Sequence, residues 1–215
     1  TYDGTDSSRT VEMDFKPDLL WIKNRNNSTD STHDHSLFDS LRGTYRVRSN
    51  STGAQNDYAT HFTSLNENGF TVADGDALND NGGTYVAYGW KAGDHDDNLP
   101  EINTNGTIDS VVSVNDAAGF SIVKYTGNGG DATVGHGLSS APEMIFIKNL
   151  DQPDDWAVFN TTVGASNYMN LNQNYGASGS GTIFGSTPTA PSSTVFSIGS
   201  NHKSGANGEE YIAYC

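Results

Sequence analysis

The chain has 215 residues with 26 acidic and 11 basic side chains, so its formal net charge is −15. A protein this acidic lacks the basic face on which phosphate binding depends, and we therefore expect no nucleic-acid partner. The single cysteine excludes an intrachain disulfide within these residues. No stretch approaches the roughly 20 apolar residues of a membrane span, so we expect no membrane insertion.

Short runs rich in valine, isoleucine, threonine and aromatic residues alternate with turns of glycine, asparagine, aspartate and serine. This pattern is typical of strands joined by tight turns, and we find no long run with helical periodicity. The predicted fold class is therefore all-β, with sandwich or jelly-roll-like units. In chain order, strands are predicted at residues 19–22, 44–48, 69–72, 84–90, 107–115, 144–147, 166–171, 194–198 and 210–214.

A phrase of nine residues occurs twice, as KPDLLWIKN at residues 16–24 and as APEMIFIKN at residues 141–149. Each copy has a proline, an acid, four apolar residues and a closing Lys-Asn pair. Other phrases recur in the same order, since HSLFDSLRG is matched by WAVFNTTVG and NGGTYVAYG by NGEEYIAYC. A collinear series of this kind predicts an internal duplication, in which each copy buries its own core.

We predict a first β-sandwich repeat at residues 1–92, a linker with a connecting strand at 93–118, and a second repeat at 119–215. The second repeat is expected to be truncated at its C-terminal end, because the first continues beyond the matching position. The repeated phrase is predicted to form the central strand of each unit, with Trp21 and Phe146 in the core. Its Lys-Asn pair is expected to turn the chain out to solvent.

The motifs of common catalytic sites do not occur in this sequence. We find no G-x-S-x-G, no P-loop, no H-E-x-x-H and no glycine-rich nucleotide fingerprint. Most acidic residues stand in turns beside glycine and asparagine, and no pair stands out as the two carboxylates of a glycosidase. We therefore predict that the chain is not an enzyme.

Two acidic loops, at residues 73–83 and 93–98, contain enough carboxylates to contribute several of the about six to eight oxygens that calcium takes. Their spacing is not that of an EF-hand, and the second copy is neutral at the position of the first loop. The expectation is no cofactor, with one Ca²⁺ site in the first copy as the alternative. His33 and His35 lack a third ligand and are expected in a solvated loop. The candidate calcium ligands are Asp74, Asp76, Asp80, Asp94 and Asp96.

Loops that differ between the two copies are the expected place for binding residues, because a rigid scaffold commonly carries them. If the ligand is a sugar, aromatic rings provide stacking surfaces and amides provide hydrogen bonds. Two of the aromatic candidates also align with positions beside strands in the first copy, so that membership of the core is the alternative for Trp156 and Tyr168. Tyr175 is then the better platform. The candidate sugar-binding residues are Trp156, Tyr168, Tyr175, Asn170, Asn172 and Asn174.

The phrases KPDLLWIKN, HSLFDSLRG, GFTVADG and NGGTYVAYGWKAG, together with YTGNG, VGHGL and the closing EEYIAYC, resemble a repeated domain of tailed-phage virion proteins. The domain occurs in tail fibres and other structural proteins, notably of marine phages and cyanophages. The resemblance covers nearly the whole chain and implies a location on the virion, outside the cell, without supplying catalytic residues. The first copy has VEMDF in place of VGHGL, so His136 is not duplicated.

Together these observations predict a non-enzymatic virion-surface module of a tail fibre or related appendage, with a structural or host-recognition role. Its expected partners are other virion subunits, copies of itself in a homo-oligomer, and a host-surface glycan. One alternative is a bacterial extracellular adhesin or filament subunit stabilised by calcium. A second alternative is a fragment of a glycan-degrading tailspike.

Overall fold

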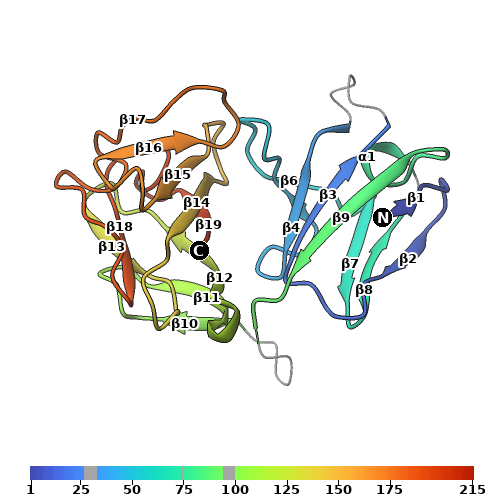
Figure 1. Cartoon of the computed structure of the whole chain (residues 1–215), viewed down its shortest axis with the longest axis horizontal. Helices are drawn as coiled ribbons and strands as arrows, with labels where there is room; N and C mark the ends of the chain where they lie inside the picture. The colour runs from blue at the N-terminus through green and yellow to red at the C-terminus, as the bar shows by residue number, and fades with distance from the viewer. Residues whose placement is uncertain (27–32, 74, 94–99) are drawn as a thin grey trace. The chain divides into compact units, whose positions relative to one another are not determined.

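Figure 1 shows the computed structural model of the chain, which describes residues 1–26, 33–73, 75–93 and 100–215. The structure is 42% strand and 3% helix, and this confirms the predicted all-β class. The helical elements include α1 (Asp76–Asn79) and a 3-10 turn at Asp116–Ala118. No helix among the described residues is long and apolar enough to cross a membrane.

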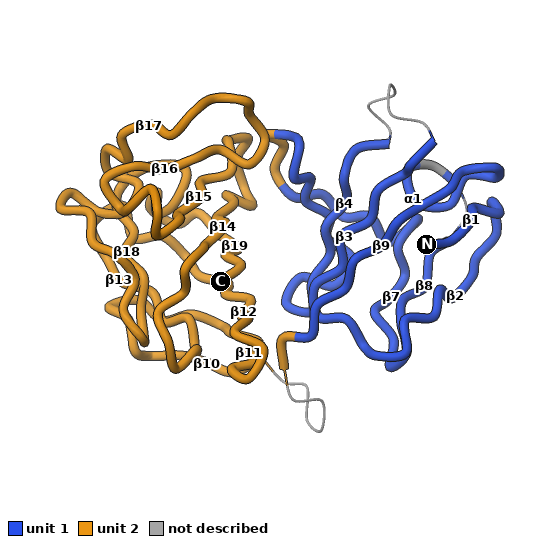
Figure 2. The backbone as a smooth tube through the Cα atoms, viewed as in Figure 1, with its two compact units in different colours: residues 1–51, 55–91 blue, residues 52–54, 92–215 orange. Residues whose placement is uncertain are grey.

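The chain divides into two compact units, which Figure 2 shows in separate colours. Unit 1 contains Thr1–Ser51 and Gln55–Lys91, and unit 2 contains Thr52–Ala54 and Ala92–Cys215. Each unit has an apolar core of its own. The strand expected near residues 107–115 belongs to the main sheet of unit 2.

Unit 1 is a small sandwich of two antiparallel sheets. One sheet has the order β1-β9-β3-β4 and the other the order β2-β8-β7, while β5 and β6 pair separately. Side chains from both sheets meet in one buried apolar cluster, which includes Ile22 of β3 and Phe70 of β8. The strands are β1 (Tyr2–Asp3), β2 (Arg9–Glu12), β3 (Leu19–Asn24), β4 (Ser36–Asp39), β5 (Tyr45–Arg46), β6 (Asn56–Asp57), β7 (Phe62–Asn66), β8 (Gly69–Val72) and β9 (Thr84–Trp90).

Unit 2 contains an eight-stranded sheet with the order β10-β11-β12-β19-β14-β15-β16-β17, and a two-stranded sheet of β13 and β18. Its core includes Ile147 from the large sheet and Phe196 from the small one. The strands are β10 (Glu101–Asn103), β11 (Ser110–Asn115), β12 (Phe120–Thr126), β13 (Ala132–Gly135), β14 (Met144–Asn149), β15 (Ala157–Asn160), β16 (Asn167–Asn170), β17 (Ser178–Gly179), β18 (Val195–Ile198) and β19 (Glu210–Tyr214).

The repeated phrase forms β3 and β14, but its aromatic residues do not occupy the core. Ile22 and Ile147 are buried in the two core clusters. Trp21 and Phe146 are only half-buried, because neighbouring residues of a strand point to opposite faces of the sheet. The prediction that these two rings are core residues is therefore wrong.

The side chains of the Lys-Asn pair that ends the phrase are buried in the second copy, whereas Lys23 of the first copy is half-buried. Lys148 and Asn149 are both 0% exposed, and Asn24 is 2% exposed. Lys148 and Asn149 end β14, and Asn149 Oδ1 then accepts hydrogen bonds from Asp151 N at 3.0 Å and Gln152 N at 2.9 Å. This is the turn to solvent that the sequence predicts after the pair, since residues 151–153 are exposed, while the buried Lys148 Nζ donates to Asn149 O at 2.7 Å.

Corresponding tyrosines in the two copies of the repeat have corresponding strand partners. Tyr2 pairs with Tyr85 in the β1–β9 ladder, and Tyr125 pairs with Tyr211 in the β12–β19 ladder. The rings of the first pair stack with centroids 4.9 Å apart, and those of the second with centroids 5.3 Å apart. The internal duplication stays a prediction from the sequence, and these pairings are the structural features in its favour.

Candidate ligand-binding loops of unit 2

Three loops of unit 2 are tied to one another by polar side chains. They follow β14, β16 and β18, and cover residues 150–156, 171–177 and 199–209. All three loops overlap segments that differ between the two copies of the repeat. Their connections make this group of loops the candidate binding surface of the chain.

Lys203 joins the third loop to the first. Its Nζ atom lies 2.6 Å from Asp154 Oδ1 and 3.1 Å from Asp155 Oδ2. Burial alone would lower the pKa of Lys203, but its hydrogen bonds to the two carboxylates and their negative charges outweigh burial and raise the pKa. The ammonium group is therefore held in its charged form between the two loops.

Asp155 also joins the first loop to the second. Its Oδ1 atom accepts hydrogen bonds from Asn172 Nδ2 at 2.7 Å and from Gln173 Nε2 at 2.9 Å. Burial alone would raise the pKa of Asp155, but hydrogen bonds from these two amides and from Lys203 outweigh it and lower the pKa. Asn172 Oδ1 in turn accepts from the backbone N–H of Trp156 at 2.9 Å.

A second polar group lies beneath the third loop. Asn149 Nδ2 donates to the backbone oxygen of His202 at 2.8 Å and to Glu209 Oε2 at 2.6 Å. The Tyr211 hydroxyl donates to the same His202 oxygen at 2.9 Å. The closing Asn of the repeated phrase therefore anchors a loop from inside the protein, which explains its burial.

Tyr175 lies on the loop between β16 and β17. These strands pair through Asn167 with Gly179 and Tyr168 with Ser178, so residues 171–177 form the tip of a hairpin. Tyr175 is 67% exposed, although Gln173, two residues away, is fixed to Asp155. An exposed ring on an anchored loop loses little conformational freedom when a ligand binds.

The two other aromatic candidates are less accessible. Trp156 is 0% exposed, and its ring stacks on Tyr214 with centroids 6.2 Å apart. Tyr168 is half-buried and packs against the core of unit 2. Neither ring offers an open face, so Tyr175 is the one aromatic candidate available for stacking.

The three asparagine candidates have different environments. Asn170 is half-buried, and its Oδ1 atom is buried without a hydrogen-bond partner in the structure. Asn172 is occupied in fixing the loops, as described above. Asn174 is exposed beside Tyr175 and is therefore the amide best placed to contact a ligand.

Sequence reasoning missed the residues that hold these loops together. Lys203 and Asp154 are 49 positions apart in sequence, and no local motif connects them. Gln173 and Asp155 belong to loops that vary between the copies, so the repeat pattern says nothing of their pairing. The one usable signal was the concentration of polar residues in the divergent loops.

The proposed calcium ligands are not assembled in the part of the chain that the structure describes. Asp74, Asp94 and Asp96 lie outside the described residues, as does the side chain of Asp76. Asp80 Oδ2 lies 2.8 Å from His33 Nε2. No three His, Cys, Asp or Glu side chains among the described residues gather closely enough to hold a metal ion.

The expectation of a solvated loop is wrong for His33 and inaccurate for His35. His33 is buried, with 7% of its surface exposed, and its ring contacts Asp80. His35 is half-buried, and its Nδ1 atom accepts a hydrogen bond from Trp21 Nε1 at 2.8 Å. The sequence did not indicate these partners because both lie in other strands or loops.

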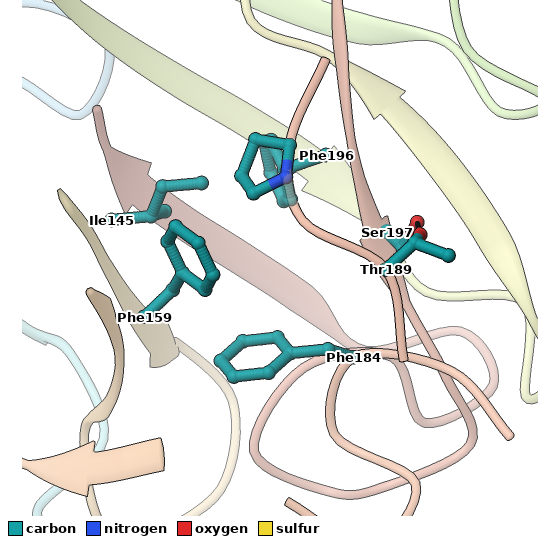
Figure 3. Close-up of a pocket in the computed structure, with 7 residues that line it drawn as sticks. Ile145, Phe159, Phe184, Thr189, Phe196 and Ser197 are labelled. Carbon is teal, nitrogen blue, oxygen red and sulfur yellow. Dashed lines mark hydrogen bonds between the residues drawn. The ribbon is translucent and has the colours of Figure 1, made fainter. Parts of the chain in front are cut away.

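A small cavity of about 10 Å³ lies beside the unit 2 core, and Figure 3 shows the residues that line it. This is about the space of one water molecule, far smaller than the roughly 300–1,000 Å³ of a typical small-molecule site. Four of its lining residues also belong to the core cluster, so it is a packing gap of the sandwich. The lining residues are Ile145, Phe159, Phe184, Thr189, Pro191, Phe196 and Ser197.

Comparison with curated proteins and with solved structures found no match. Comparison with protein-family models found one described as "Domain of unknown function (DUF7483)", and it matches residues 1–215. Because the match covers the whole sequence, from the first strand of unit 1 to the last strand of unit 2, this chain belongs to the DUF7483 family.

Proposed function

We propose that this chain is a non-enzymatic structural and recognition module of a tailed-phage virion, part of a tail fibre or related appendage. Its unit 2 loops bind a glycan on the host surface. The observation that carries this proposal is the exposure of Tyr175 on a loop whose base is fixed through Gln173 and Asp155.

The chemistry of these loops suits a sugar. A tyrosine ring presents an apolar face to the C–H groups of a pyranose, and its hydroxyl remains free to bond with water or ligand. Asn174, exposed beside it, offers both a donor and an acceptor. The ion pairs of Lys203 keep the neighbouring loops in place without consuming either of these groups.

The charged residues of the site have the properties of structural ion pairs. A general acid requires a carboxyl with a raised pKa, whereas the pKa of Asp155 is lowered. A nucleophilic lysine requires a lowered pKa, whereas that of Lys203 is raised. Lys148 does have a pKa lowered to about 8 by burial, but its 0% exposure keeps substrates away from it.

A glycan array and a whole-cell binding assay with susceptible host cells test this proposal. We expect the unchanged chain to bind, and Tyr175→Ala to reduce binding by about tenfold, the loss of roughly 1.4 kcal/mol. Tyr45→Ala is the matched control, because Tyr45 is also an exposed tyrosine, at 43%, and lies in unit 1. Equal binding by Tyr175→Ala and the control would remove Tyr175 from the site.

A further inference from the structure

The sequence of unit 2 contains a long stretch without a charged residue. Residues 156–201 include no Asp, Glu, Lys, Arg or His, although Asp, Glu, Lys and Arg make up 17% of the whole chain. At that frequency of 17%, a stretch of 46 residues would carry about eight of them. This charge-free stretch runs from β15 to β18 (Figure 1) and includes the hairpin loop of Tyr175.

Burial does not explain the absence of charge. Residues 174–179, at the tip of the hairpin and in β17, are all exposed, and so are residues 192–194. The surface of a soluble domain is typically roughly 25–35% Lys, Arg, Glu and Asp. These exposed segments instead offer serine and threonine hydroxyls, the Asn174 amide and the Tyr175 ring. Such neutral groups donate and accept hydrogen bonds, as the hydroxyls of a sugar do.

The rest of unit 2 is strongly acidic. By sequence, unit 2 has thirteen acidic residues and three lysines, whereas unit 1 has thirteen acidic and eight basic residues. The formal charges are therefore −10 for unit 2 and −5 for unit 1. Within the candidate loops, the two aspartates and the lysine that tie the loops together sum to −1, and the exposed Asp151 adds another negative charge.

The cations of unit 2 are already committed. Lys148 is 0% exposed, and Lys203 is held between two aspartates. Lys124 Nζ lies 2.9 Å from Oε1 of Glu210. The ring of His202, which is exposed on the third loop, has its Nδ1 atom 3.7 Å from a glutamate oxygen. Every lysine in the described part of unit 2 is therefore buried or paired, and an anionic ligand would have to displace a carboxylate to reach one.

We propose that the glycan bound by the unit 2 loops is uncharged, and that these loops discriminate against glycans with carboxylate, sulfate or phosphate groups. This inference rests on the proposed glycan-binding function. The Tyr175 ring and the neutral polar groups of the charge-free stretch recognise the sugar. Acidic glycans are rejected because their charges lose water beside a negatively charged surface that provides no cation in exchange.

Three forms of one polysaccharide test the discrimination. Polysaccharide isolated from the host surface is used as isolated, with its carboxylates reduced to alcohols, and with its primary hydroxyls oxidised to carboxylates. We expect the reduced form to bind at least as well as the isolated form. The oxidised form should bind about tenfold more weakly at an ionic strength of about 0.1 M, where charges interact over about 10 Å.

Two controls separate charge from the loss of a hydroxyl group. Raising the ionic strength to about 1 M shortens the Debye length to about 3 Å, so the oxidised form should recover part of its binding. The binding of the reduced form should not change with salt. Methyl esterification of the new carboxylates removes their charge and should also restore binding.

A lysine placed in the charge-free stretch tests the same point from the side of the protein. Ala177 is exposed two residues after Tyr175. Ala177→Lys should raise the affinity for the oxidised form by about threefold or more, because it supplies an unpaired cation. Ala177→Gln, which adds a side chain without charge, is the matched control and should not.

The outcomes distinguish this inference from the function on which it rests. Loss of binding on carboxyl reduction, or binding of the oxidised form as strong as that of the reduced form, would overturn the inference and leave glycan binding intact. If none of the three forms bound, the proposed glycan binding would be wrong, and this inference with it.

Discussion

The Nζ atom of Lys203 lies 2.6 Å from Oδ1 of Asp154. This contact joins two loops that the sequence separates by 49 positions, and it supports the surface on which Tyr175 is exposed. The side chains of Lys203 and Asp154 are 15% and 23% exposed, so solvent screens the pair only in part.

Replacing Lys203 with methionine should therefore weaken unit 2. We expect the free energy of unfolding to fall by roughly 1–2 kcal/mol, because two charge-assisted hydrogen bonds are lost and two partly buried carboxylates are left without their cation. Lys124→Met is the control, since its ion pair with Glu210 is more exposed, at 29% and 40%, and should be worth less than about 1 kcal/mol. Equal losses in urea titrations of the two variants would contradict a special role for Lys203.

Replacing Lys148 should raise the free energy of unfolding, whereas replacing Lys203 should lower it. Burial lowers the pKa of Lys148 from 10.5 to about 8, so the unfolded chain binds this proton more tightly than the folded one. As the pH falls from 10.5 to about 8, Lys148 takes up its proton in the unfolded chain but not in the folded one, so the free energy of unfolding decreases. Below about pH 8 both states carry the proton, and the loss of stability stays constant. Lys148→Met should be more stable than the unchanged chain near neutral pH by roughly 1–3 kcal/mol.

Urea titrations of the two proteins at several pH values measure this difference. The advantage of Lys148→Met should shrink as the pH rises through the window between about 8 and 10.5. A variant that is less stable at neutral pH would show that the bond from Lys148 Nζ to Asn149 O outweighs the cost of burying the charge.

His136 gives a prediction in mildly acidic solution. Its Nδ1 atom accepts from Leu138 N at 3.2 Å, and its Nε2 atom lies 3.2 Å from Ser192 O. Burial lowers the pKa of His136 below 6.5, although the bond to Ser192 opposes this. The contribution of neutral His136 to the free energy of unfolding is therefore complete above about pH 6.5. It declines as the pH falls toward the pKa that His136 has in the folded chain.

The measurement is the free energy of unfolding of the chain and of His136→Gln across this range. Glutamine keeps a donor and an acceptor but does not titrate, so the variant should lose less stability on acidification. Parallel pH profiles for the two proteins would show that His136 is not protonated on unfolding.

The repeated phrase gives a test of which face of β14 is buried. Ile147 is 1% exposed within the core cluster, so Ile147→Ala should cost roughly 2–5 kcal/mol. Phe146→Ala should cost less, despite the larger side chain, because Phe146 is half-buried on the opposite face. Denaturant titrations that give the reverse order would restore the reading of Phe146 as a core residue.

The sequence predicted the strands better than it predicted their faces. The bounds of β9 and β19 match the expected strands 84–90 and 210–214, because alternation and flanking glycines mark both. The burial of Lys148 was not predicted, since lysine is almost never fully buried. The strands β4 and β15 were also missed, although their phrases recur, because both are short and contain polar residues.

The candidate site was predicted only in outline. Divergence between the copies indicated the loops, and Tyr175 is exposed in one of them. The sequence left open whether Trp156 belongs to the core, and the structure buries it. The bonds of Lys203 to Asp154 and Asp155 depend on how the chain folds back on itself, which no local pattern encodes.

Binding without bond cleavage is tested most directly by incubating the chain with polysaccharide isolated from the host surface. The bound fraction and the length of the polysaccharide are measured in the same sample. We predict binding that Tyr175→Ala weakens, with the polysaccharide unchanged in length. Release of oligosaccharides that grows with time, and that a heat-denatured sample does not cause, would contradict a non-enzymatic recognition module.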